Sequence, residues 1–168
     1  MKKLNLFIAI TIIMQLFCFG QNEANLRKEL EKLKPLLGKT WTSEMKDPSR
    51  QKTLHLTSTY EVMHGGKILK YHQECKELNV QTDGYFYYDP DKKEIAYLTL
   101  KSNGNITIGK VKEENGNLLL YGHVIFSDRK LEFRNTYEIT TKGEIIDKYF
   151  RFERGEWRAG HSRVWTVK

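Results

Sequence analysis

The sequence predicts an all-β protein, a ten-stranded antiparallel up-and-down β-barrel with a short N-terminal helix. Two observations support this prediction. Apolar residues recur at helical spacing only before Gly38, and after Thr40 they alternate with polar residues in successive short segments. Nine turn signals rich in Gly, Asn, Asp and Pro separate these segments, which gives ten strands. Because an open meander would leave two exposed edges, closure into a barrel is favoured.

The first twenty residues predict a secretory signal peptide. Lys2 and Lys3 precede an apolar run over residues 4–19, and Gly20 is a small residue at a suitable cleavage point. An alternative is a lipoprotein signal that ends at Cys18 and leaves a lipid anchor there. The run is short and interrupted by polar residues, which argues against a retained transmembrane helix. We therefore expect a secreted or periplasmic protein.

The segment between the signal peptide and the barrel, residues 21–39, predicts an amphipathic helix that ends at Leu37. Gly38 can take the left-handed conformation that terminates a helix. The barrel domain then occupies residues 40–168, and the Trp41 indole at the start of its first strand is expected to fill the barrel floor. The apolar face of the helix is formed by leucines at spacings of three and four: Leu26, Leu30, Leu33 and Leu37.

Composition excludes several classes of protein. Removal of the signal peptide leaves a single cysteine, Cys75, so the domain cannot form an internal disulfide and must be held by packing and hydrogen bonds. Lys2 and Lys3 carry two of the seven net positive charges, which leaves +5 scattered singly among acidic residues. Without a basic stripe, an exported protein is not expected to bind nucleic acid.

The interior of such a barrel is the place where a ligand could bind, because eight to ten strands enclose a volume that side chains fill or that holds one small ligand. Tyrosines are spread over many of the predicted strands. They are either ordinary core residues or the lining of a lumen with polar tips. The parity of the ninth strand is ambiguous, since Ile145, Tyr149 and Arg151 oppose a face that is also apolar. A bulge there would change which residues line the lumen.

The Gly38-Lys39-Thr40-Trp41 motif, the leading helix, the ten hairpin-linked strands and the arginine and tryptophan of the last strand resemble the calycin superfamily. Within it, the chain is similar to exported bacterial lipocalin-like domain proteins of unassigned function. The lipocalin hallmark is Gly-x-Trp with a late arginine across the indole. The spacing here is one residue longer, and Arg163 or Arg158 would be that arginine. The resemblance implies a barrel closed by Trp41 and Arg163.

Two more distant relatives suggest ligands. Nitrobindins bind haem through a histidine on a late strand, and His161 lies on the last strand here, on the same inward face by parity as Trp157, Arg163 and Trp165. In fatty-acid-binding barrels, a late-strand arginine and a tyrosine two residues further on hold the ligand's carboxylate. Arg163 matches that arginine, and Trp165 stands where the tyrosine would be.

The sequence contains no recognisable catalytic or metal-binding motif. The five histidines lie on different strands or turns without ligand spacing, and no Gly-x-Ser-x-Gly elbow is present. His72 and Glu74 share a strand face, and we interpret that face as a solvated outer surface. We therefore expect no catalytic residue, no metal and no cofactor, with haem on His161 as the alternative.

These observations predict a non-enzymatic exported barrel that binds a small hydrophobic or amphipathic molecule in its lumen. A buried Arg163 would need an acidic partner or a ligand carboxylate. The alternatives are a haem barrel and a filled barrel whose outer faces bind a partner. The expected polar contacts to the ligand are Tyr60, Tyr137, Tyr149, His161 and Arg163.

Overall fold

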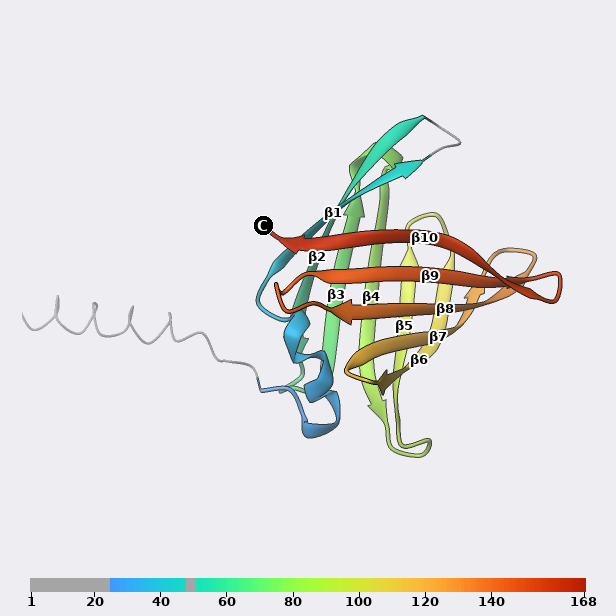
Figure 1. The fold of residues 1–168 in the computed structure, drawn as a ribbon. Coiled ribbons are helices and arrows are strands. Elements are labelled where there is room, and N and C mark those ends of the chain that lie inside the picture. Colours follow the sequence, from blue (N-terminus) through green and yellow to red (C-terminus); the bar gives the residue numbers. More distant parts are fainter. Residues whose placement is uncertain (1–24, 48–50) are drawn as a thin grey trace, which may run out of the picture.

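In the computed structural model, which describes residues 25–47 and 51–168, ten antiparallel strands form one closed barrel (Figure 1). Each strand pairs with its neighbours in chain order and β1 closes on β10, so the predicted closed meander is confirmed. The signal peptide and the lipid anchor at Cys18 concern residues outside the described ranges. The strands are β1 (Thr40–Asp47), β2 (Lys52–Met63), β3 (Ile68–Cys75), β4 (Val80–Asp89), β5 (Glu94–Lys101), β6 (Ile106–Glu114), β7 (Asn117–Ile125), β8 (Lys130–Ile139), β9 (Ile145–Glu153) and β10 (Glu156–Val167).

The N-terminal helix η1 (Lys28–Leu36) lies at one end of the barrel and is a 3₁₀-helix (Figure 1). Its buried leucines are spaced by three residues, because side chains at i and i+3 eclipse in a 3₁₀-helix. Leu36 is therefore buried where the sequence predicted Leu37, and Leu37 is only half-buried. Gly38 has a φ of +66°, which agrees with its predicted role at the helix end.

The floor of the barrel is closed by a contact between η1 and β1. The Trp41 indole Nε1 donates a hydrogen bond of 3.0 Å to the Leu36 carbonyl oxygen, so a carbonyl at the helix end gains a buried partner. Leu30 and Leu33 fill the space beneath, with exposed fractions of 0% and 1%. Among the described residues, no helix is long and apolar enough to cross a membrane.

One predicted turn is displaced. The sequence placed a turn from Asn79 to Thr82, whereas a short helix, η2 (Lys76–Leu78), makes the connection and β4 begins at Val80. Asn79 takes the left-handed conformation with φ of +50°, which asparagine tolerates. Thr82 is consequently a buried strand residue that faces the lumen.

The inner face of β10 is interrupted by a bulge between Ala159 and Ser162. Below the bulge, toward the floor, Arg163 pairs in register with Asp147. Beyond it, Trp157 pairs with Phe152 on the outer face. The parity prediction that placed Trp157 on the inward face was therefore wrong, because the extra residue reverses the alternation.

Three tyrosines of the lumen lie over glycines of the neighbouring strand, and the third of them is Tyr149, which lies over Gly160. Tyr71 and Gly84 are register partners, as are Tyr97 and Gly109. A Cβ atom at Gly84 would overlap the Tyr71 ring, and one at Gly109 would crowd the Tyr97 ring. Glycine at these positions lets each ring lie against the barrel wall.

Candidate functional site

A row of three polar side chains crosses the lumen face of the last strands. Tyr137 on β8, Asp147 on β9 and Arg163 on β10 are successive register partners. Arg163 Nε donates to Asp147 Oδ2 at 2.7 Å, and the Trp165 indole Nε1 donates to the same oxygen at 3.1 Å. The Asp147 side chain is fully buried, and that of Arg163 is 9% exposed. Arg163 thus has an acidic partner inside the barrel, Asp147.

The electrostatics of this row centre on Asp147. Burial alone would raise the pKa of its carboxyl, but the neighbouring His161 and Arg163 outweigh burial and hold that pKa at about 2. His161 Nε2 lies 3.6 Å from Asp147 Oδ2, which is longer than a hydrogen bond. Asp147 is therefore an anion at neutral pH, and Arg163 balances its charge.

A belt of seven rings runs around the lumen from β2 to β10. Neighbouring ring centroids are 5.1–6.2 Å apart, and the closest pair is Tyr149 and His161, which stack nearly parallel at 6°. Such contacts are the usual geometry of packed aromatic side chains. The belt skips β6 and β7, where Gly109 and Gly122 stand. Its members are Tyr60, Tyr71, Phe86, Tyr97, Phe133, Tyr149 and His161.

The tyrosines of the lumen are both deep and accessible. Burial raises the pKa of Tyr60 to about 12 and raises that of Tyr137 well above its usual range. Both side chains are nevertheless half-buried, so they keep surface that a water molecule could touch. These tyrosines therefore keep accessible surface on the inner face of the barrel, where a bound molecule could contact them.

Several buried polar atoms of the lumen have no hydrogen-bond partner within the described part of the chain. Because such atoms are costly to bury unpaired, they mark positions where a small molecule or water completes the hydrogen bonding. Both acceptors and donors are among them, which makes the lumen surface polar as well as aromatic. They are Ser43 Oγ, Thr82 Oγ1, Tyr97 Oη, Asn135 Oδ1, Asp147 Oδ1 and His161 Nε2.

All five residues that the sequence selected as ligand contacts lie on the lumen face, and their role in binding stays a prediction. The two closure residues are not brought together in the predicted way. The Arg163 guanidinium lies over the Trp165 ring at 4.7 Å, and the cation over the Trp41 ring is Lys39, at 5.3 Å. Trp41 closes the floor through Leu36 instead. Arg158 is exposed on β10.

Two residues of the lumen, Asp147 and Lys101, were not predicted from the sequence. Asp147 shares the parity of Ile145 and Tyr149, which was the available signal. Lys101 ends β5 on the same face as the buried Tyr97 and Thr99. Because Lys101 lies close to a predicted turn, the alternation along the strand did not identify it as inward-facing.

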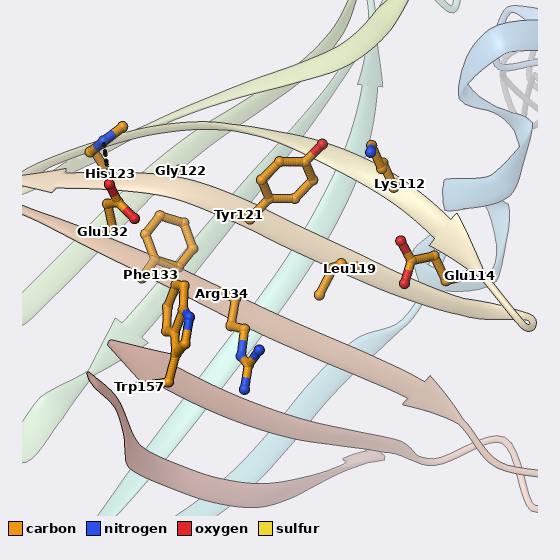
Figure 2. Close-up of a pocket in the computed structure, with 10 residues that line it drawn as sticks. All are labelled: Lys112, Glu114, Leu119, Tyr121, Gly122, His123, Glu132, Phe133, Arg134 and Trp157. Atoms are coloured by element: carbon orange, nitrogen blue, oxygen red, sulfur yellow. Dashed lines mark ion pairs between the residues drawn. The ribbon is translucent and has the colours of Figure 1, made fainter. Parts of the chain in front are cut away.

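The outer wall carries a groove of about 350 Å³ between β6, β7, β8 and Trp157 (Figure 2). The Arg134 guanidinium lies 4.7 Å from the Trp157 ring and 4.8 Å from the Phe150 ring. His123 and Glu132 form an ion pair of 4.0 Å across it (Figure 2). Cations and carboxylates thus alternate along an exposed surface, which gives the groove no single charge to recognise.

The histidine and acidic pair singled out in the sequence lies on the outer face of β3. His72 contacts Asp83 Oδ1 at 3.0 Å through Nδ1 and Glu74 Oε1 at 3.2 Å through Nε2. Its hydrogen bonds with Asp83 and then with Glu74 raise the pKa of the imidazole. Within residues 25–47 and 51–168, no group of three or more His, Cys, Asp or Glu side chains is arranged to hold a metal ion.

Comparison with known proteins supports the fold. The structure is similar to the crystal structure of Rv2717c from M. tuberculosis, with a TM-score of 0.59, 14% sequence identity, and coverage of 86% of this chain and 99% of that chain. No family model and no curated protein matches the sequence. At this identity the likeness shows the fold alone. The neighbour thus supports the predicted barrel fold, and the resemblance to calycins stays a prediction.

Proposed function

We propose that this barrel is a non-enzymatic binding protein that encloses one small amphipathic molecule in its lumen. The observation that carries the proposal is the lumen itself, in which Tyr60 and Tyr137 are surrounded by protein and still accessible. The aromatic belt provides apolar contact area, and the polar atoms without partners provide a few directional contacts. That combination is typical of small-molecule sites. Export directed by residues 1–20 is part of the proposal, and it would place binding outside the cytoplasm.

Uptake of a neutral fluorescent probe tests this function. N-phenyl-1-naphthylamine fluoresces strongly in apolar surroundings, and we expect saturable uptake by the chain without residues 1–20. Asn135→Phe places a ring in the centre of the lumen at a side chain whose Oδ1 has no partner, so it should weaken uptake about tenfold or more. Thr136→Phe, one residue along β8 and outward-facing, is the matched control and should leave uptake unchanged. Equal uptake by both variants would place the probe outside the barrel.

Haem is the second candidate, and the observation in its favour is the inward His161, whose Nε2 has no hydrogen-bond partner among the described residues. The surroundings fit haem poorly. Nε2 faces the Asp147 carboxylate at 3.6 Å, and Tyr149 covers one face of the imidazole at 5.1 Å. An iron ligand would need both neighbours to move. Titration with haemin followed by absorbance decides the matter, because a sharp Soret band that His161→Ala abolishes would favour haem over the amphipathic ligand.

A further inference from the structure

Lys101 is a lysine of the lumen that has no acidic partner within residues 25–47 and 51–168. It shares the inward face of β5 with Tyr97 and Thr99, and its register partner on β4 is the fully buried Thr82. No carboxylate among the described residues lies within ion-pair distance of its ammonium. Burial lowers the pKa of Lys101, and the positive charge of Arg163 lowers it further. A cation kept inside a protein without a counter-charge is costly and marks a functional position.

Lys101 and Arg163 stand on opposite walls of the barrel. β5 is the fifth strand from β10 in either direction around the closed sheet, so the two strands face each other across the lumen. Arg163 is charge-balanced by Asp147 through Nε, which leaves its two terminal nitrogens for another acceptor. The ion pair is neutral as a unit, and Lys101 therefore gives this region of the lumen an excess positive charge.

The Thr82 hydroxyl adds a donor beside Lys101. Thr82 is 2% exposed, and its Oγ1 has no hydrogen-bond partner within the described part of the chain. An ammonium and a hydroxyl on adjacent strands, at the same register level, form a pair of donors that one anionic group can accept from. The two cations repel each other across a region of low dielectric, and a negative group between them would relieve that repulsion.

We propose that the molecule bound in the lumen is an anion, and that its negative group is held between Lys101, with the Thr82 hydroxyl beside it, and the free edge of the Arg163 guanidinium. The inference rests on the proposed binding function and specifies its ligand class. The ligand is an amphipathic acid, with an apolar or aromatic body against the ring belt and a carboxylate, sulfate or phosphate at the Lys101 position. Neutral apolar molecules bind the same space more weakly.

A matched pair of probes tests the charge requirement directly. 1-Anilinonaphthalene-8-sulfonate carries the same two ring systems as N-phenyl-1-naphthylamine and adds one sulfonate. We expect the wild-type protein to bind the sulfonate at least tenfold more tightly than the neutral probe. Lys101→Met should reduce affinity for the sulfonate about tenfold or more and leave the neutral probe within twofold. Lys101→Arg, which keeps the charge, should retain the preference.

Two outer-wall variants exclude binding at the groove of Figure 2. Lys112→Met removes an exposed lysine of that groove, and Trp157→Ala removes its aromatic wall. Neither should alter the preference for the sulfonate. If either variant abolishes it while Lys101→Met does not, the anion binds outside and the inference is overturned. Equal weakening of both probes by Lys101→Met would also overturn it, because it would indicate a change in shape and not in charge.

Different results would contradict the proposed binding function and the proposed anion site. Absence of neutral-probe uptake by the wild-type protein would remove the binding function itself. Uptake of the neutral probe with no preference for the sulfonate would leave that function and remove the anion site. Displacement by decanoate, decyl sulfate and decyl phosphate, each compared with decanol, then distinguishes the possible acids, and we expect all three anions to compete better than the alcohol.

Discussion

The floor and the lumen of this barrel are built on opposite principles. At the floor, the leucines of η1 are buried to within 1% of completeness, and the Trp41 indole satisfies the Leu36 carbonyl. In the lumen, several tyrosines are only half-buried, and within the described part of the chain Asp147 Oδ1 has no partner and Lys101 has no counter-charge. One region gains stability from nearly every group in it, and the other leaves hydrogen bonds and charge uncompensated.

The difference indicates which region carries function. Proteins tolerate unsatisfied polar groups mainly where a ligand completes them, since each such group lowers the stability of the empty state. At the floor, the Trp41 indole has its partner in the Leu36 carbonyl, and no polar atom of the described η1 residues is buried without a partner. We therefore expect changes at the floor to alter stability without altering probe affinity, and changes at the lumen cations to alter the preference for the anionic probe.

The largest loss of stability is expected from Asp147→Asn. Removal of the carboxylate leaves the nearly buried Arg163 guanidinium unpaired, and breaking one partner of a buried ion pair costs about 3–5 kcal/mol. Urea denaturation measures the loss. The double variant Asp147→Leu with Arg163→Met removes both charges and should recover most of it. A single variant that loses less than about 1 kcal/mol would contradict the importance of this pair.

Leu33→Ala at the floor is expected to cost about 3 kcal/mol, because it opens a cavity under η1. Where the variant remains folded, its affinity for both naphthyl probes should equal that of the wild-type protein. The exposed neighbour Lys34 offers the control, and Lys34→Ala should leave the urea midpoint unchanged. A loss of probe affinity in Leu33→Ala would show that the floor and the lumen are not independent.

The sequence predicted the architecture because its signals are local. Alternation and turn residues determine each hairpin, and the need to pair the outer edges predicts closure. The helix type was legible in part, since Leu30, Leu33 and Leu36 repeat every three residues and Pro35 cannot donate a backbone hydrogen bond. The α-helical pattern used for the prediction accepts spacings of either three or four residues, and it therefore placed Leu37 on the buried face in place of Leu36.

The lumen was predicted less completely because its composition depends on parity across whole strands. Parity placed Tyr137 and Arg163 correctly on the inner face, but it failed for Trp157 beyond the bulge. Gly160, a glycine inside a strand, was the signal of that bulge. Contacts between distant strands decide which inward residues lack partners. A local sequence pattern carries no information about these contacts. The free charge of Lys101 is therefore visible only in the structure.

Acid titration should reveal the Asp147 pair as a loss of about 2.5 kcal/mol in total, spread between about pH 5 and pH 1. The pKa of Asp147 is held at about 2 in the folded chain, and an unfolded aspartate titrates near 3.9. A lowered pKa stabilises the folded state above both values, and this contribution disappears as pH falls through 2. Denaturation at successive pH values measures it. Glu77 at the surface, whose pKa His55 lowers to about 2, titrates in the same range, so Asp147→Asn is the control that isolates the buried pair.

The smallest expected change in stability is that of Lys101→Met, and whether the variant is more or less stable distinguishes a binding role from a structural one. Lys101→Met removes a half-buried charge that has no acidic partner among the described residues, so we expect the empty barrel to become more stable by about 1 kcal/mol, which raises Tm by about 2–4 °C. Lys112→Met, on the exposed outer face, should leave Tm unchanged. A lysine that serves the fold would lower Tm when removed, and that result would contradict a binding role. A rise in Tm together with loss of the anion preference would show that the barrel gives up stability at Lys101 in order to bind.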